Sequence, residues 1–458
     1  MNNKMFKKIE IWILYLSILI MILFAIGFGT LVRQELVGTK KAGWLSKTAL
    51  FLAEMPVNVR LIFNKKDAYI ADRHKHLNKG FNIYSDQVSY GTNNSVYLLL
   101  SRWDGDINEG IIELIDLREY KVIHSWNPDL SSLYKVFESK NRLLEDLKIT
   151  KPENLFQLFS PVLANGILYF HGNNTPIFGI DAESNIINIF DDVYHHSLEL
   201  TPDNKIWATN VSCPIKNKLI ISQECRLIRD ENIVLLNLNG EELYKKSVTD
   251  LLYENDINVF KNLDDIKDIT HINDVQPIYS KTDYWNIDDV FLSLRSLDIV
   301  LLYSPKTNQI KWVSNSMSGL KNQHDVNIIS NSKISIFNNN IEYKISEKTK
   351  YRDVNDYSTV MVYDFKDNTY SSYLDEAMRE NEIRTDTSGK GEITSSGGVL
   401  IEETNSGRLI YINNQGEKVW EFYNKSNNGK VARITWHNLI TEDFELKHVK
   451  DFIKTHLN

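Results

Sequence analysis

Three histidines stand at matched places in a repeating pattern of the sequence. His196 and His324 each lie ten residues before an apolar run, which begins at Ile206 and at Ile334. A looser third copy of the pattern begins at His271. A histidine at the same point of successive repeats is hard to explain by packing alone. The pattern therefore predicts that these histidines belong to a functional site.

Two more polar residues accompany the third histidine. Asn273 follows His271 by two positions, so both side chains share one face of an extended chain. Arg295 ends a mostly apolar stretch and directs a fixed cation at a specific place. An arginine with imidazole N–H donors suits a sulfate or phosphate group. The alternative is a metal held by three histidines, but no carboxylate is matched to them and an arginine is unfavourable beside a metal, so we expect none.

The pair His195–His196 offers two candidates, of which only one can face the same way as His324. The ten-residue spacing favours His196, and His195 becomes a supporting binding residue. Taken alone, each histidine is more often a surface or core residue than a catalyst, and Arg295 also fits a buried ion pair. Their occurrence together at repeat-matched positions favours a functional site.

Short strands must position these residues. From about residue 85 the chain reads as six units, each with an apolar run, a run often ending in Asp or Asn, and a run often ending in Trp. This predicts an all-β fold, a six-bladed β-propeller over residues 85–430 with a C-terminal closing segment at 431–458. A β-sandwich or several small β domains is the alternative. Because the first strand of each blade lines the channel, three consecutive blades would each direct one histidine into it.

Short helices interrupt the strand pattern. Ser131 to Lys148 and Tyr373 to Ile383 have apolar residues at helical spacing, so we expect helical insertions between blades. Cys213 and Cys225, the only cysteines, flank a turn-like segment. A hairpin there would bring them together as a disulfide in an oxidising compartment, and two separate thiols are the alternative.

The N-terminal region reads as a membrane anchor. Residues 1–10 form a short tail, and residues 11–32 form an uncharged apolar run, long enough as a helix to cross a hydrocarbon core of about 30 Å. A cleaved signal peptide is the rival reading, but its apolar region is usually about 7–15 residues long. We therefore expect a single-pass signal-anchor in the inner membrane, with the tail in the cytoplasm and the large domain periplasmic or otherwise extracytoplasmic.

A juxtamembrane segment, residues 33–84, follows the anchor. Within it, residues 43–55 read as an amphipathic helix that ends at Pro56. This helix fits the bilayer surface and the soluble domain equally well. The net charge of −8 is spread along the chain, which argues against a nucleic-acid partner. The sequence leaves the oligomeric state open.

The sequence resembles the arylsulfotransferase (aryl-sulfate sulfotransferase) family over roughly residues 160–425. The resemblance rests on short motifs: His195-His196 before Pro202-Asp-Asn-Lys, His271-x-Asn273, Ser293-x-Arg295, Gln323-His324, Asp364, Gly407-Arg408 and Val419-Trp-Glu-Phe. It implies a six-bladed propeller that moves a sulfuryl group from an aryl sulfate ester to a phenolic acceptor. The transfer would pass through a histidine intermediate, without a nucleotide sulfate donor or another cofactor.

Matched to that family by position, His324 is the expected nucleophile. His196 or His195, His271, Asn273 and Arg295 would then bind and polarise the sulfate oxygens, and one of the other histidines would protonate the leaving phenolate. The N-terminal 85 residues and the degraded turns before the strands depart from the family pattern. Two alternatives stay open: a non-catalytic propeller that serves as a binding or assembly module, and transfer or hydrolysis of another anionic ester.

Overall fold

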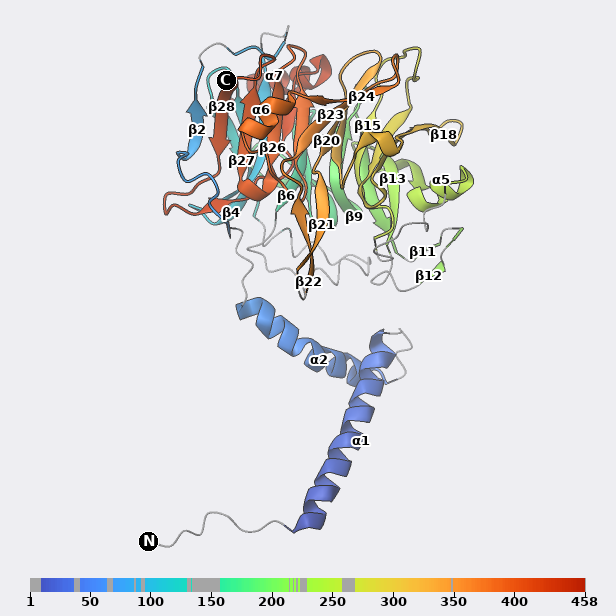
Figure 1. Ribbon diagram of the computed structural model, residues 1–458. Helices are drawn as coiled ribbons and strands as arrows, with labels where there is room; N and C mark the ends of the chain where they lie inside the picture. Colours follow the sequence, from blue (N-terminus) through green and yellow to red (C-terminus); the bar gives the residue numbers. More distant parts are fainter. Residues whose placement is uncertain are drawn as a thin grey trace. The chain divides into compact units, whose positions relative to one another are not determined.

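The computed structural model describes most of the chain. The described residues are 10–36, 42–63, 69–85, 88–91, 95–129, 133, 157–213, 215–216, 218–219, 221–222, 229–257, 268–346 and 349–457. The chain divides into two compact units, Met1–Lys66 and Asp67–Asn458. Figure 1 shows two helices in the first unit and a mostly β arrangement in the second.

The first unit holds α1 (Ile11–Leu36) and α2 (Trp44–Phe63). Among the described residues, only α1 contains a span that is long and apolar enough to cross a membrane, Ile11–Gln34. The prediction that the second helix ends at Pro56 was wrong, since α2 continues for about two more turns. A proline inside a helix removes one backbone donor but does not always break the helix.

The described residues of the second unit form five sheets of four or more strands, besides smaller pairs. One contains, in order, β30 (Asn438–Ile440), β3 (Tyr97–Asp104), β4 (Glu109–Asp116) and β5 (Lys121–Trp126). A second contains β15 (Ile272–Pro277), β16 (Val290–Leu294), β17 (Ile299–Ser304) and β18 (Gln309–Val313). A third contains β19 (His324–Ile328), β20 (Lys333–Asn338), β23 (Thr359–Asp364) and β24 (Thr369–Tyr373).

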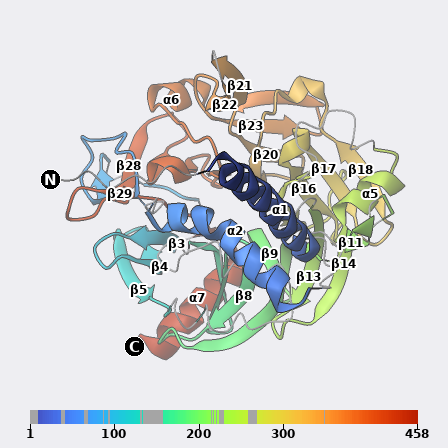
Figure 2. The same ribbon diagram turned by 90° about the horizontal axis from the view of Figure 1, so that it is seen from below.

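Two larger sheets complete the set. The five-stranded sheet contains β2 (Gly80–Ile83), β28 (Lys418–Tyr423), β27 (Arg408–Ile412), β26 (Val399–Glu403) and β25 (Lys390–Ile393). The seven-stranded sheet contains β14 (Glu242–Ser247), β13 (Asp230–Asn237), β10 (Lys205–Ser212), β9 (Ile186–Leu200), β8 (Thr175–Ile180), β7 (Ile167–Gly172) and β6 (Leu158–Ala164). In Figure 2 the sheets follow one another around a common centre, so the arrangement is propeller-like.

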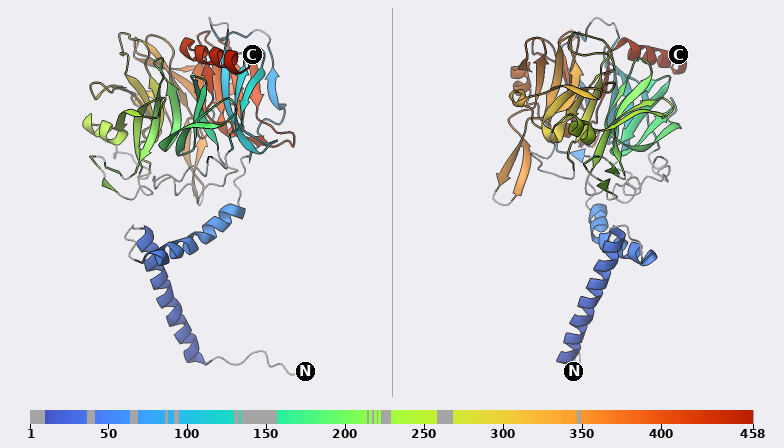
Figure 3. Two further views of the ribbon diagram at one scale, coloured as in Figure 1. Left: turned by 180° about the vertical axis from the view of Figure 1, so that it is seen from behind. Right: turned by 90° about the vertical axis from the view of Figure 1, so that its right-hand side faces the viewer.

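Smaller elements attach to this ring. Two-stranded pairs are β1 (Tyr69–Ile70) with β29 (Val431–Ala432), β11 (Ile215–Lys216) with β12 (Ile221–Ser222), and β21 (Ile341–Ser346) with β22 (Thr349–Val354). The β21–β22 hairpin projects from the sheets in Figure 3. The helices are α5 (Val248–Glu254), α6 (Asp375–Glu380) and α7 (Asp443–His456). Helix α6 lies in the predicted insertion at 373–383, whereas the insertion at 131–148 lies, apart from Leu133, outside the described residues.

The second unit starts earlier than residue 85, where the sequence placed the first blade. β1 pairs with β29 and β2 pairs with β28, so residues 69–83 belong to the sheets and not to the juxtamembrane segment. At the other end, β30 pairs with β3, so the chain's last strand joins the first sheet. Both ends of the unit are therefore held by backbone hydrogen bonds.

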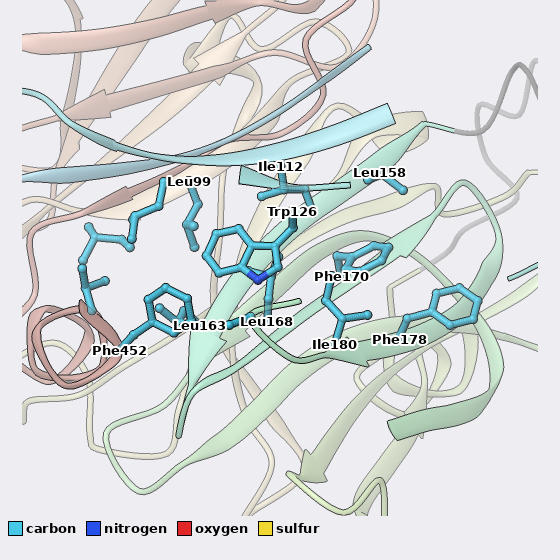
Figure 4. Close-up of a cluster of buried hydrophobic side chains, with 14 of the residues drawn as sticks. Leu99, Ile112, Trp126, Leu158, Leu163, Leu168, Phe170, Phe178, Ile180 and Phe452 are labelled. Carbon is cyan, nitrogen blue, oxygen red and sulfur yellow. The ribbon is translucent and has the colours of Figure 1, made fainter. Parts of the chain in front are cut away.

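Apolar residues of neighbouring sheets form the core. Trp126 is fully buried and its ring lies 5.2 Å from that of Phe452 on α7. Figure 4 shows these two rings with Leu99 and Ile112 of one sheet and Leu168 and Phe170 of the next. Because each sheet buries its faces against the neighbouring sheets, a sheet does not need a long helix to cover it. Truncation of a tryptophan buried in this way typically costs about 3–5 kcal/mol of stability.

Side-chain to backbone hydrogen bonds link the inner segments to one another around the centre. In each, a polar side chain of one inner segment pairs with a backbone group of another, and in all but one pair the two segments belong to different sheets. The pairs are Ser160 with His196, Ser197 with Val275, Asp274 with Val326, Asp325 with Gly391, Glu402 with Trp436, and Thr435 with Leu158. These bonds satisfy buried backbone groups and fix the innermost segments relative to one another.

Candidate active site

The innermost strands carry bulges, and a residue in the left-handed conformation lies in each bulge or within two residues before it. The φ angle is +58° at His196, +43° at His271 and +33° at Asp325, which follows His324. At or beside each, the pairing register shifts, between β9 and β10, between β15 and β16, and between β19 and β20. A non-glycine residue held there costs about 1–3 kcal/mol, and such bulges re-aim side chains near functional sites. The recurring histidines thus coincide with a recurring local conformation.

The three predicted histidines lie together. The ring centre of His196 is 5.0 Å from that of His271 and 6.4 Å from that of His324. The indole of Trp436, from the segment before β30, lies 5.8 Å from His196 and 6.4 Å from His324. Rings this close can contact one small group at the same time.

Asn339 fixes the protonation pattern of His324. Its amide nitrogen donates to the carbonyl oxygens of Thr385 (3.0 Å) and Ser388 (2.7 Å), so its Oδ1 must face the imidazole. That oxygen lies 2.6 Å from Nδ1 of His324, and the carbonyl oxygen of Asn322 lies 3.1 Å from the same nitrogen. Two acceptors around Nδ1 require it to carry the proton. The lone pair of the neutral ring is therefore on Nε2.

His271 has a carboxylate partner. Its Nδ1 is hydrogen-bonded to the carboxylate of Asp268, three residues earlier. Burial alone would raise the pKa of Asp268, but the hydrogen bond and the charge of His271, together with Arg229, lower it to about 2. Asp268 is thus ionised at neutral pH and accepts a hydrogen bond from Nδ1–H of His271.

His195 packs edge-on against His196, with the two ring centres 4.9 Å apart. The Nδ1 atoms of the pair are 2.7 Å apart, and His195 is only 1% exposed. The hydroxyl of Thr209 donates to the backbone carbonyl of His195. On its far side, Nε2 of His195 lies 3.8 Å from Oε1 of Glu231. His196 is therefore the member of the pair beside His324, and His195 contacts it from behind.

Burial keeps most of these rings neutral. It lowers the pKa of His195, His196 and His324 well below the ordinary value of 6.5, and the positive charge of Arg295 lowers that of His324 further. A histidine must be neutral to act as a nucleophile, so the environment of His324 favours that role.

Arg295 and Asn273 join the cluster differently. Arg295 begins a 3-10 turn directly after β16, and its backbone N–H donates to the carbonyl of His271 at 3.1 Å. Its positive charge acts on His324, the proposed nucleophile, and lowers the pKa of that ring. The amide nitrogen of Asn273 instead donates to the carbonyl of Gln323 at 2.8 Å. Asn273 therefore ties β15 to the residue before His324, while its buried Oδ1 has no hydrogen-bond partner among the described residues.

Comparison with known sequences decides the family. The profile described as Arylsulfotransferase (ASST) matches residues 169–425, which is more than half of the chain and includes all the histidines of the cluster. The chain belongs to the arylsulfotransferase family. No curated protein matches the sequence significantly. Membership in the arylsulfotransferase family supports aryl sulfotransferase activity in general, with small-molecule donors and acceptors.

Solved structures similar to this arylsulfotransferase-family chain are distant. A protein of unknown function from Bacteroides caccae has 11% identity and a TM-score of 0.45, over 76% of this chain and 100% of that one. The WD40 domain of Neurospora crassa Pan2 has 9% identity and a TM-score of 0.37, over 73% and 82%. At these values the similarities carry no argument about this chain.

Sequence reasoning missed four residues of the arylsulfotransferase-family site. Asp268, Asn339, Glu231 and Trp436 contact the histidines, but none stands at a repeat-matched position that we recognised. For Trp436 the sequence offered one clue, because this residue directly precedes another histidine, His437, in the closing segment. His437 itself is buried, and its Nδ1 is hydrogen-bonded to Glu402 at 2.8 Å.

Two further sequence predictions concern metals and cysteines. No group of three or more His, Cys, Asp or Glu residues in the described part of this arylsulfotransferase-family chain is arranged to hold a metal ion. Cys213 is disulfide-bonded. Cys225, its predicted partner, lies outside the described residues.

Proposed function

We propose that the protein is a nucleotide-independent sulfotransferase that moves a sulfuryl group from an aryl sulfate ester to a phenol through a sulfated His324. The observation that supports this most is the Asn339 contact. It holds the proton of His324 on Nδ1 and leaves the lone pair on Nε2, in a ring whose centre lies 6.4 Å from that of His196 and on which the positive charge of Arg295 acts. A neutral imidazole with a fixed lone pair next to cationic groups suits attack on an anionic ester.

The first half-reaction starts with attack of Nε2 on sulfur. The N–S bond forms, the bond between sulfur and the aryl oxygen breaks, and the phenolate leaves with a proton from the site. Arg295 and His271, whose ring is oriented by Asp268, stabilise the charge on the sulfuryl oxygens. Sulfuryl transfer resembles phosphoryl transfer, in which positioning and charge stabilisation supply most of the rate.

The second half-reaction reverses these roles. The acceptor phenol attacks the sulfur of sulfated His324, gives its proton to a base in the site, and the N–S bond breaks. The N–H of His324 at Nδ1 remains bonded to Asn339 throughout, so the ring keeps its orientation in both steps. Asn273 positions His324 through the Gln323 carbonyl.

A direct assay tests the function. The full chain in detergent is incubated with nitrophenyl sulfate, with and without a phenol acceptor. We expect nitrophenol release that depends on the acceptor and formation of the sulfated acceptor. Absence of release over a broad set of aryl sulfates would contradict the proposed activity.

We further propose six blades. The seven-stranded sheet supports two of them, because β9 pairs with β8 through residues 186–194 and with β10 through residues 194–200. A left-handed residue also recurs at or just before the first strand of six strand groups, at Ser160, His196, His271, Asp325, Ser388 and Trp436. An experimental structure that counted five or seven blades would contradict this.

We also propose that α1 is a membrane anchor with the second unit on the periplasmic side. The exposed apolar length of α1 supports the anchor, and the Cys213 disulfide supports an oxidising compartment, with Cys225 as its partner. The protein should stay with membranes after alkaline extraction and be digested by protease added to spheroplasts. Release by alkali, or protection of the second unit, would contradict the anchor or its orientation.

A further inference from the structure

His195, the second histidine of the pair, faces the buried carboxylate of Glu231. The proposed reaction does not yet give that carboxylate a role. His196 has one ring nitrogen, Nδ1, against Nδ1 of His195 at 2.7 Å. Of two neutral imidazoles in such contact, one must donate and the other accept. The remaining nitrogen of His196, Nε2, is the one left for substrate. The protonation of His196 at Nε2 therefore depends on that of His195.

The other nitrogen of His195 faces Glu231. Nε2 and Oε1 are 3.8 Å apart, and a shift of about 1 Å brings them to hydrogen-bond length. Both atoms are buried, and neither has a hydrogen-bond partner among the described residues. The second oxygen of Glu231 is held by the hydroxyl of Thr270 (2.7 Å) and the N–H of Ile272 (2.8 Å). Two hydrogen bonds thus hold one oxygen of Glu231, while the other oxygen faces the imidazole of His195.

We propose that His196, His195 and Glu231 form a proton relay that serves both half-reactions of the proposed sulfuryl transfer, on which this inference rests. In the loaded state the Glu231 carboxyl donates to Nε2 of His195, whose Nδ1–H donates to Nδ1 of His196. Nε2 of His196 then carries the proton that the leaving phenolate takes. His195 and Glu231 act only through His196, so they are positioning residues.

The number of protons is conserved when the relay runs in either half-reaction. As His196 gives its Nε2 proton to the phenolate, its Nδ1 takes the proton from Nδ1 of His195, and Nε2 of His195 takes the proton of Glu231. The two rings remain neutral and Glu231 becomes a carboxylate. In the second half-reaction the acceptor phenol gives its proton to Nε2 of His196, and the three transfers run backward to reload Glu231.

The surroundings suit a carboxyl group that exchanges one proton. Burial raises the pKa of Glu231, and the nearby charge of Asp268 raises it further, while His271, Thr270 and Arg229 act in the opposite direction. Burial lowers the pKa of His195, so the proton does not rest there as a second charge. His271 is a poorer relay, because its Nδ1 is already held by Asp268, whose carboxyl has a pKa lowered to about 2 and so carries no proton to pass on.

Leaving groups of different basicity test the relay. In the full-length Glu231→Gln variant, the amide oxygen can still accept from Thr270 and Ile272, but the side chain cannot pass a proton. With aryl sulfates of phenols whose pKa is near 10, we expect kcat/KM to fall about 10²-fold or more. With nitrophenyl sulfate, whose phenolate leaves without a proton, the fall should stay within about threefold.

Two further variants complete the test. His195→Asn keeps a polar group against His196 but breaks the path to Glu231, so it should show the same dependence on the leaving group. Glu445→Gln removes a buried carboxyl that does not touch the histidines and should leave all donors unaffected. Melting curves check that each variant is folded.

Each outcome decides the question. A steeper dependence of rate on leaving-group pKa in both relay variants supports the relay. Equal losses on all donors indicate a structural role for Glu231, and unchanged rates exclude any role, so both overturn it. If Glu231→Gln does not fold, His195→Asn decides alone. Failure of the unmodified protein to turn over nitrophenyl sulfate would instead overturn the proposed function, and the relay with it.

Discussion

The inner segments carry two polar clusters, each made of buried and half-buried side chains, that have little in common chemically. The histidine cluster consists of His195, His196, His271 and His324. The carboxylate cluster lies one to three residues further along three of the same inner segments and includes residues of β25 and α7. Its members are Glu199, Asp274, Asp325, Glu392 and Glu445, with Lys390 among them.

The carboxylate cluster is satisfied from within. Nζ of Lys390 lies 2.6 Å from Glu392 and 3.7 Å from Asp325. Asp274 accepts from the N–H of Val326 on the next inner strand at 2.7 Å. Burial raises the pKa of Asp274 to about 7, with the charge of Asp325 adding, and that of Glu445 to about 8. Protons bound by the carboxyl groups and the positive charge of Lys390 thus offset the negative charge of this cluster. The cluster holds neighbouring strands together.

The histidine cluster is arranged in the opposite way. Asn339, Asp268 and His195 each occupy one nitrogen of a different ring and leave the other nitrogen for a ligand. The comparison teaches that burial of polar groups does not by itself make a site. What distinguishes a reactive cluster is that its neighbours fix the protonation of each ring without consuming its reactive atom.

The largest expected effect is at His324. His324→Ala removes the nucleophile and should lower kcat for nitrophenyl sulfate by about 10⁴-fold or more. His448→Ala, at a half-buried histidine outside the cluster, is the matched control and should retain full activity. Turnover by the His324 variant within tenfold of the unmodified protein would remove the distinction between the clusters.

Arg295 should matter next. Arg295→Lys keeps the charge but loses the planar fork that matches sulfate oxygens, so we expect kcat/KM to fall about 10²–10³-fold. The Lys390→Arg variant makes the same kind of exchange in the carboxylate cluster and should affect stability instead of turnover. Steady-state kinetics and thermal melting of both variants measure the contrast. Loss of activity in Lys390→Arg alone would reverse our assignment.

Asn339→Leu should have an intermediate effect. Without the amide, Nδ1 of His324 loses its strongest acceptor and the productive protonation pattern is no longer favoured, which should lower kcat about 10²-fold. The donor KM should change little, since Asn339 lies behind the ring. A variant in which only KM rises would show that Asn339 shapes the substrate pocket instead.

The two clusters should give opposite pH dependence of stability. Buried histidines with lowered pKa bind fewer protons folded than unfolded, so their contribution falls as pH drops through about 6.5, by at most about 1.4 kcal/mol per pH unit for each ring. Glu445, with its pKa raised from 4.5 to about 8, binds more protons when folded, so stability is lost as pH rises through that window.

Chemical denaturation at several pH values measures both slopes. Relative to the unmodified protein, His324→Ala should become more stable as pH falls from 7 to 5, and Glu445→Gln should become more stable as pH rises from 5 to 8. Parallel curves for either variant and the unmodified protein would contradict the assigned protonation states.

The smallest expected effect on activity is from Asp274→Asn. Asp274 is about half protonated near pH 7, and the asparagine oxygen can still accept from Val326. We expect kcat within about twofold of the unmodified protein, because the carboxylate cluster does not touch the sulfuryl group. A large loss of kcat with an unchanged melting temperature would place this cluster in the reaction.

The repeat pattern predicted much of the site. A bulge recurs on the inner strands at His196, Asn273 and Asp325, and each of the three histidines lies in it or within two residues before it. The three rings lie together even though their positions relative to the bulge differ. Asn339, Asp268 and Glu231 follow no such register, since each reaches the rings from an end of a strand or a loop fixed only by tertiary packing. The continuation of α2 past Pro56 could not be predicted from the sequence either, because local helix propensity does not show whether a helix tolerates an internal proline.

Detection of sulfated His324 tests the central claim most directly. The full-length protein is incubated with an aryl sulfate donor and no acceptor, quenched at alkaline pH, digested, and analysed by mass spectrometry. We predict one sulfuryl group on the peptide that contains His324, lost when a phenol is added before quenching. Acceptor-dependent turnover with no sulfated peptide, or with the group on His196 or His271, would contradict the account.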